Sequence, residues 1–182
     1  MHTQQYTWHA HTTLQSALES GSLDTVTWLQ QQRPQQWDAA LFRRAALSGS
    51  VPLCEYLLRE GCPVCERAST TAAQNGHHSV LRLLHKHGAP RNDRDVYLAA
   101  VRSGSNETME CALSISCGTD AAALSEALTN MLAAAGASCR LFACEWLLQR
   151  GAEWPPVLQS EDGTPWPRAM AQWAQFEGYV PP

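Results

Sequence analysis

Two cysteines and four histidines are the side chains with the clearest potential for redox or metal chemistry. Cys62 and Cys65 form a C-x-x-C pair, and four histidines follow in the next stretch of chain: His77, His78, His85 and His87. A C-x-x-C pair performs redox chemistry at the start of a helix in a βαβ setting, and thiolates together with imidazoles bind zinc. The two candidate chemistries are therefore a redox dithiol and a zinc site.

The surroundings and the spacing of these residues favour an ordinary structural role. No strand pattern flanks the C-x-x-C pair, and six to nine residues separate the two histidine pairs, where a zinc finger has roughly three to five. On one helix, the two ends of this histidine run would lie about 12 Å apart. The favoured interpretation has no metal and no cofactor, and a zinc or redox module at Cys62 and Cys65 is the alternative.

No catalytic motif accompanies these residues. The sequence holds no nucleophile elbow, no glycine-rich phosphate loop and no H-E-x-x-H, which are the short patterns tied to hydrolysis, nucleotide binding and zinc catalysis. Carboxylates stand alone or beside arginine, as in Asp93-Arg94-Asp95. We therefore expect a protein that is not an enzyme and that takes no small-molecule substrate.

The composition predicts an all-α fold. The 182 residues include 26 Ala and 21 Leu but only 8 Val and 1 Ile, so good helix formers dominate and β-branched residues are scarce. This length suits one domain with a substantial core. No apolar run approaches the ~20 residues that span a bilayer, so we expect no membrane partner.

Charge is unevenly distributed along the chain. The formal net charge is -4, but residues 41–105 hold nine basic and five acidic residues, a local excess of +4. Solvated helix faces are the favoured explanation. A docking patch, either for an acidic protein or for RNA phosphates, is the alternative.

The cysteines indicate a reducing compartment. Their number is odd and they are scattered among leucines and alanines: Cys54, Cys62, Cys65, Cys111, Cys117, Cys139 and Cys144. A secreted disulfide scaffold would carry an even set in a loop-rich chain. We expect an intracellular location, the cytoplasm in first place and mitochondria as the alternative, because residues 1–10 resemble neither a signal peptide nor an Arg-rich transit peptide.

A repeated unit organises the chain. Its plainest copies are AALSGSVPLCEYLLREGCP (residues 45–63) and AAQNGHHSVLRLLHKHGAP (residues 72–90), and ALESGSLDTVTWLQQQRP (residues 17–34) is an earlier copy. Gly21, Gly49, Gly76 and Gly104 recur at nearly equal intervals, which sets the period of the unit. Each unit predicts a small-residue helix, a turn at glycine and an amphipathic helix. Such hairpins bury their apolar faces only by stacking on one another, which makes a solenoid.

These residues resemble the ankyrin repeat. Its core is Ala-Ala-x-x-Gly followed by Val/Leu-x-x-Leu-Leu-x-x-Gly-Ala, and Asp162-Gly163-Thr164-Pro165 is similar to its opening motif. The short period and the Trp- and Cys-Pro-marked turns resemble the divergent ankyrin arrays of protist and algal proteins. The resemblance implies about five helix-turn-helix repeats, tight turns in place of hairpin fingers, and partners that dock on the turns and the adjacent concave helix face.

The resemblance also divides the chain. We expect an N-terminal tail over 1–11, repeats over 12–158, and a capping helix with a tail over 159–182. The fourth unit, Tyr97–Gly118, lacks the glycine that should end its second helix. In the fifth unit we assign Gly136 to the hairpin turn. The interval from Gly136 to Gly151 is then longer by three than the regular spacing, which implies an insertion between them.

Aromatic residues are expected in the cap and in the stack. The capping helix is predicted over Thr164–Glu177, with Trp166, Ala169, Met170 and Trp173 facing the repeats. Trp28 and Trp146 occupy stripe positions of second helices, so we expect them in the core. Trp37 and Trp154 fall in turns between repeats, where packing is the favoured role and an exposed binding anchor is the alternative.

The predicted function is protein binding without catalysis, in a structural subunit of a larger assembly. The alternative is an RNA-contacting accessory subunit of a ribonucleoprotein, such as an organellar ribosome, that uses the basic middle repeats. The candidate partner-binding residues lie in the turns and on the first helices: Trp37, Leu47, Glu66, Arg67, Gln74, Asn75, Arg91, Arg94, Asp95, Arg102 and Trp154.

Overall fold

A computed structural model describes residues 10–32, 34–117, 120–159, 163 and 165–179, and these residues contain eleven α-helices. In chain order the helices are α1 (Ala10–Glu19), α2 (Leu23–Gln32), α3 (Ala39–Ser48), α4 (Val51–Arg59), α5 (Glu66–Gln74), α6 (His78–Lys86), α7 (Asp93–Ser103), α8 (Asn106–Ser116), α9 (Ala121–Ala137), α10 (Leu141–Gln149) and α11 (Arg168–Phe176). Apart from one isolated bridge between Gln159 and Pro165, the described residues form no β-structure.

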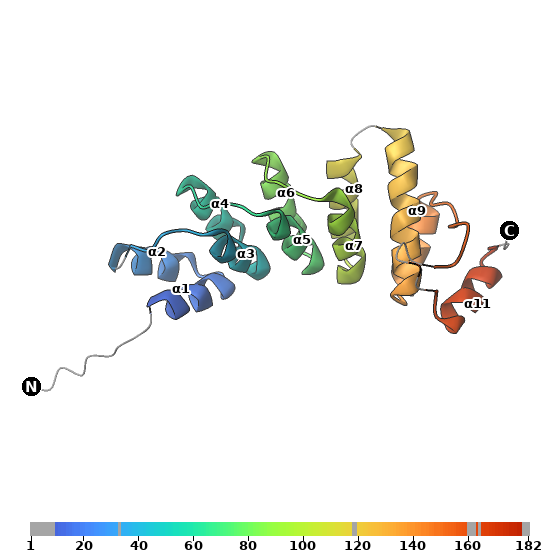
Figure 1. Ribbon diagram of the computed structural model, residues 1–182, viewed down its shortest axis with the longest axis horizontal. Helices are drawn as coiled ribbons and strands as arrows, with labels where there is room; N and C mark the ends of the chain where they lie inside the picture. Colours follow the sequence, from blue (N-terminus) through green and yellow to red (C-terminus); the bar gives the residue numbers. More distant parts are fainter. Residues whose placement is uncertain (1–9, 33, 118–119, 160–162, 164, 180–182) are drawn as a thin grey trace, which may run out of the picture.

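The helices pair into five hairpins that stack in chain order along the long axis of the molecule (Figure 1). Each first helix from α1 to α7 contacts the next first helix, up to α9, and each second helix from α2 to α6 contacts the next second helix, up to α8. This arrangement confirms the predicted all-α solenoid of about five helix-turn-helix repeats. The expected tail over 1–11 lies almost entirely outside the described residues, although α1 already begins at Ala10.

Small residues and leucines form the core of the stack, as their spacing predicts. Ala45 and Ala46 of α3 and Ala72 and Ala73 of α5 are all 0% exposed. Their short side chains allow neighbouring first helices to approach closely, while leucines of the second helices fill the space between the two layers. The fully buried leucines of α4 and α6 include Leu53, Leu57 and Leu84.

A left-handed residue ends the first helix of each hairpin. Gly49 has a φ of 74° and Gly76 a φ of 77°, a backbone conformation that is strained for residues with a Cβ. A Cβ on Gly49 would lie 2.5 Å from the His77 ring of the next repeat. His77 Nε2 is also 2.9 Å from the Leu47 carbonyl oxygen. Glycine therefore serves both the turn and the close approach between repeats.

The links between repeats are short segments without hairpin fingers. Residues 60–65 connect α4 to α5 and residues 87–92 connect α6 to α7, and neither segment forms a strand. The backbone N–H of Cys62 donates to the Leu57 oxygen over 2.9 Å, and that of Ala89 donates to the Leu84 oxygen over 3.0 Å. These bonds terminate the second helices and turn the chain toward the next repeat.

The assignment of the fifth hairpin turn to Gly136 is wrong. Cys139 takes the left-handed position, with a φ of 55°, and it is the one residue other than glycine with a positive φ in the described chain. It precedes Gly151 by the same interval as Gly49 precedes Gly61. The extra residues of this repeat lie earlier, because α9 spans 17 residues where α5 spans 9.

Gly136 instead forms a notch for the C-terminal cap. A Cβ at this position would lie 2.1 Å from the Trp166 ring, and Trp166 Nε1 donates to the Ala133 oxygen over 3.0 Å. The capping helix α11 begins at Arg168, later than the expected Thr164, which lies outside the described residues. Met170 and Ala174 are its buried residues.

Three expectations for individual side chains in the core need correction. Ala169 is exposed, because it lies on the outer side of α11. Trp28 is 51% exposed, since α2 lies at the end of the stack and has a neighbouring second helix, α4, on one side. Trp146 is half-buried and lies beneath the Arg150 guanidinium, whose carbon is 4.2 Å from the ring centroid.

Candidate functional site

The first helices present a row of exposed side chains at equivalent positions. Leu47, Gln74 and Arg102 each stand two residues before the left-handed glycine of their hairpin, and all three are exposed. Arg67 and Asp95 stand seven residues before Gln74 and Arg102, and are exposed as well. Seven residues make two helical turns, so both sets lie on one side of their helices.

We call this surface the first-helix face and define it by the exposed side chains of α3, α5 and α7. Its members are Ala40, Arg43, Leu47, Glu66, Arg67, Gln74, Arg94, Asp95 and Arg102. The candidate residues Glu66 and Arg94 lie at its edge, in the first turns of α5 and α7. Asn75 is exposed beside Gln74, and its side-chain amide donates to the Thr71 oxygen over 2.9 Å.

Backbone carbonyls beneath this face join the repeats to one another. The Arg140 guanidinium, one residue after the left-handed Cys139, donates to the Arg102 oxygen over 2.7 Å. His77, one residue after Gly76, contacts the Leu47 oxygen in the same way. Two equivalent residues therefore hold the backbone beneath the first-helix face.

Three of the sequence-predicted residues are engaged within the fold. Arg91 Nε donates to Asp93 Oδ1 over 2.6 Å, and its other nitrogens lie 3.1 Å from His85 Nδ1 and 3.4 Å from the Ile115 oxygen. Trp37 packs edge-on against Tyr56, with ring centroids 6.4 Å apart. Arg91 and Trp37 therefore make contacts within the stack.

Trp154, the third of these residues, is the centre of an aromatic cluster at the cap. Its ring centroid lies 6.5 Å from that of Trp166, 6.1 Å from that of Trp173 and 5.9 Å from that of Tyr179. Such tilted and edge-to-face contacts stabilise the packing between residues 150–159 and α11. Intramolecular packing therefore accounts for Trp154.

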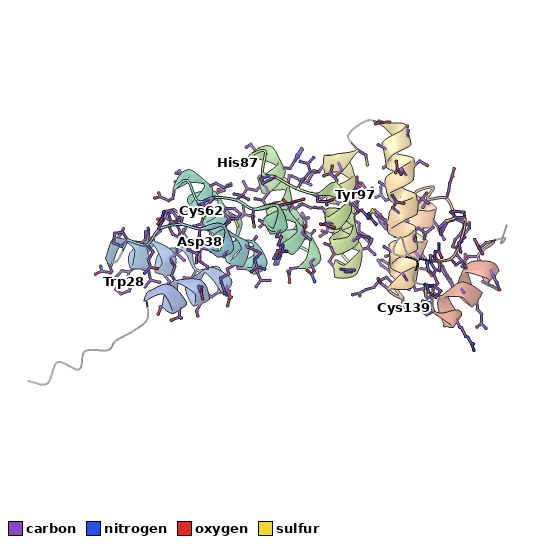
Figure 2. All side chains as sticks on the ribbon, viewed as in Figure 1. Trp28, Asp38, Cys62, His87, Tyr97 and Cys139 are labelled. Carbon is purple, nitrogen blue, oxygen red and sulfur yellow. The ribbon has the colours of Figure 1, made fainter. Side chains whose placement is uncertain are left out.

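The C-x-x-C pair does not gather into a metal centre. Among the described residues, no three histidines, cysteines or carboxylates lie together in a way that would hold a metal ion. Cys62 is buried beside Asp38 (Figure 2), and its thiol donates to the Asp38 carbonyl oxygen over 3.4 Å. Burial, followed by the nearby Asp38 carboxylate, raises the pKa of Cys62 to about 12. A thiol in this state is a poor nucleophile and a poor metal ligand.

Comparison with known families and structures agrees with the repeat. Residues 70–96 match the family model of the ankyrin repeat. The chain carries an ankyrin repeat. The whole stack is similar to one chain of a solved structure, the complex of a predatory endopeptidase from Bdellovibrio bacteriovorus with an immunity protein. The TM-score is 0.59 and the identity 20%, over 91% of this chain and 93% of that chain. No curated protein matches the sequence.

This ankyrin-like solenoid also carries exposed apolar residues that sequence reasoning missed. Leu141 is 42% exposed and Phe142 is 62% exposed, both in the first turn of α10. The equivalents of Phe142 in α4, α6 and α8 are Pro52, Ser79 and Glu107. The repeats show this difference at position 142 when they are aligned on their turn residues, with Cys139 and not Gly136 as the turn of the fifth repeat.

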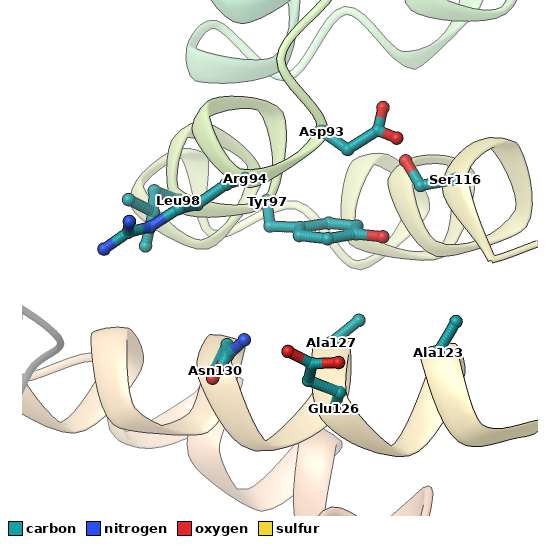
Figure 3. Close-up of a pocket in the computed structure, with 9 residues that line it drawn as sticks. All are labelled: Asp93, Arg94, Tyr97, Leu98, Ser116, Ala123, Glu126, Ala127 and Asn130. Atoms are coloured by element: carbon teal, nitrogen blue, oxygen red, sulfur yellow. The ribbon is translucent and has the colours of Figure 1, made fainter.

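A groove between the fourth and fifth repeats of the solenoid also escaped the sequence analysis. It holds about 330 Å³ between the start of α7, the end of α8 and the N-terminal half of α9 (Figure 3). Tyr97 and Glu126 lie on its opposite walls. The sequence carries no local signal for this groove, because it depends on the displacement of α9 from α7.

No described helix combines the length and the apolar character that crossing a membrane requires.

Proposed function

We propose that this chain is a non-catalytic adaptor that binds another protein through its first-helix face, as a structural subunit of a larger assembly. The observation that carries the proposal is the row of exposed side chains over a fully packed core, with apolar Leu47 at 42% exposure among charged neighbours. An exposed apolar residue within a polar surround is typical of the centre of a protein interface.

The fold supports this function more than it supports catalysis. Solenoids bind partners over extended surfaces, and each repeat adds a further set of exposed positions to the same face. Catalysis needs an enclosed pocket with activated groups, whereas burial raises the pKa values of Cys54, Cys62, Cys111 and Cys144, that of Cys54 to about 12. The free thiols in the core also support a reducing compartment as the place of action.

Charge reversal on the first-helix face tests the proposal. The variant Arg67→Glu with Arg102→Glu changes two exposed side chains of this face, and we expect it to weaken binding of the partner captured from a native extract by tenfold or more. The control variant Arg59→Glu with Lys86→Glu makes the same change in charge on the second helices α4 and α6, away from the first-helix face. Equal binding by wild type and the first variant would contradict the proposal.

Binding to RNA is the second candidate, favoured by the four arginines Arg43, Arg67, Arg94 and Arg102 on the same face. Contacts with phosphates release counterions, so the affinity for RNA falls steeply with salt, by about one power of ten for each tenfold rise in salt per contact. We expect the response of the captured partner to salt to be shallow. A steep salt dependence that RNase treatment abolishes would assign the surface to RNA.

A further inference from the structure

The groove between α7 and α9 exists because the fifth repeat is longer than the others. The interval between the left-handed residues Gly104 and Cys139 is longer by seven than the interval between Gly76 and Gly104. The seven additional residues extend α9 at its N-terminal end. These extra turns of α9 stand opposite the start of α7 and leave a space of about 330 Å³ between the two helices.

The groove has the shape of a slot with one aromatic wall. The Tyr97 ring presents a face to α9, across from Glu126, Ala127 and Asn130 (Figure 3). Ala123 and Ala127 are the small residues of the opposite wall, and their short side chains leave room for a flat group beside the ring. The Arg94 side chain extends past Leu98, away from the Tyr97 ring.

The charges around the ring favour a cation. Glu126 is exposed on one side of the Tyr97 ring, and its carboxylate has no hydrogen bond or ion pair within the described part of the chain. Asp93 lies on the other side of the ring and is already paired with Arg91, so Glu126 is the carboxylate that remains for a ligand. Burial, the hydrogen bond between the hydroxyl and Cys117 Sγ over 3.2 Å, and the Asp93 carboxylate raise the pKa of Tyr97 to about 12. The phenol therefore stays neutral, and its surroundings oppose further negative charge.

We propose that this slot receives the guanidinium group of an arginine side chain from the protein partner. The guanidinium would stack on the face of Tyr97, pair with the Glu126 carboxylate and donate to the side-chain oxygen of Asn130. Arginine fits better than lysine because its charge is planar, stacks on aromatic rings and forms paired hydrogen bonds with a carboxylate. This inference rests on the proposed function, and it names a second contact, which borders the first-helix face at Arg94.

The test uses small probes on the full chain. Nα-acetyl-arginine amide is titrated into the ¹⁵N-labelled protein and compared with the citrulline and lysine amides. Citrulline has the shape of arginine without its charge, and lysine has the charge without the planar group. We expect the arginine probe to shift the amide signals of Tyr97, Glu126 and Asn130, with the citrulline probe binding at least tenfold more weakly and the lysine probe in between.

Two variants assign the binding to the slot. Glu126→Gln removes the carboxylate and Tyr97→Leu removes the aromatic face, and we expect each to weaken arginine binding by fivefold or more. Glu145→Gln, which neutralises an exposed carboxylate on α10, is the matched control and should leave binding unchanged. Circular dichroism confirms that each variant is folded before its titration is interpreted.

Three results would overturn the inference. One is a titration in which the slot residues do not shift at millimolar arginine probe. The second is equal binding of the citrulline and arginine probes, which would show a slot for a flat neutral group. The third is tighter binding of adenosine monophosphate than of the arginine probe, which would point to a nucleotide. Because the probes do not involve the native partner, failure here is separate from failure of the first-helix variants in partner binding.

Discussion

At the scale of the residue, Cys139 has a strained backbone conformation, which the other hairpins avoid by having glycine at the same position. It adopts a φ of 55° where Gly49, Gly76 and Gly104 have φ values of 74°, 77° and 73°. A side chain in this conformation costs about 1 kcal/mol relative to glycine. We predict that Cys139→Gly raises the free energy of unfolding by about 1 kcal/mol in urea denaturation followed by circular dichroism.

The reciprocal change provides the control for this prediction. Gly76→Ala places a Cβ at a φ of 77°, in ordinary contact 3.7 Å from Ser105 Cβ, so its effect comes from the backbone. We expect it to lower the free energy of unfolding by about 1 kcal/mol. Destabilisation by Cys139→Gly would mean that the thiol makes a favourable contact and that position 139 is not under strain.

Substitution of buried leucines and of an exposed leucine distinguishes a role in core packing from a role in partner binding. Leu57 and Leu84 are both 0% exposed, whereas Leu47 is 42% exposed. We predict that Leu57→Ala or Leu84→Ala lowers the free energy of unfolding by about 2–5 kcal/mol. Leu47→Ala should change it by less than about 0.5 kcal/mol and should weaken partner binding. A similar stability loss in all three variants would contradict the assignment of Leu47 to a binding surface.

At the scale of the element, the cap depends on the contact between Gly136 and Trp166. A Cβ at Gly136 would lie 2.1 Å from the ring, so Gly136→Ala must displace Trp166 and break its hydrogen bond to the Ala133 oxygen. We predict a loss of about 1–3 kcal/mol, the usual cost of overpacking. Hydrogen exchange should localise the loosening to α11 and to the C-terminal end of α9.

A double variant checks the cause of that loss. Trp166→Ala removes the ring that the new methyl group strikes, so Gly136→Ala should add little further destabilisation in the Trp166→Ala background. Additive losses in the two variants would show that Gly136 is needed for a reason other than the ring.

The sequence predicts those helices and turns that contain the repeated residues. The alanine pairs, the leucine stripes and the glycine turns of α3 to α6 define both the hairpins and their order of stacking. The turn at Cys139 escapes prediction because its left-handed residue is not glycine, and Gly136, the nearest glycine, accommodates Trp166 of the distant cap. The exposed state of Trp28 escapes it because burial depends on what lies beside α2, which a stripe pattern does not specify.

The candidate binding surface also has one part that the sequence predicts and one part that it does not. The positions of Leu47, Gln74 and Arg102 follow from the repeat register, and the structure places them on one side of consecutive helices. The slot at Tyr97 depends on the insertion in the following repeat and on the separation of α7 and α9. No local pattern in the sequence records that separation.

At the scale of the whole molecule, the buried thiols make stability depend on alkaline pH. Burial is the largest cause that raises the pKa values of Cys54, Cys62 and Cys144 to about 12, while an unfolded thiol ionises near pH 8.5. The folded state therefore keeps protons that the unfolded state releases. We predict a free energy of unfolding that is constant below about pH 8 and falls as the pH rises toward 12.

Urea denaturation at pH 7, 9 and 10.5 measures this dependence, and Cys62→Ala is the suitable control. Alanine is the residue at the equivalent positions 89 and 152, both of them buried, so the substitution suits the fold. The variant should show a slope shallower by up to about 1.4 kcal/mol per pH unit. Identical slopes in wild type and variant would show that Cys62 ionises in the folded protein as it does in the unfolded chain.

The placement of tryptophan gives this molecule an optical label at each end. Trp28 and Trp37 lie in the first repeats, while Trp154, Trp166 and Trp173 form the aromatic cluster at the cap, and no tryptophan occurs between residues 38 and 145. Intrinsic fluorescence therefore reports melting at the two ends and is silent about the middle. A solenoid that unravels from its ends would lose its emission signal before its far-ultraviolet ellipticity, without any dye attached.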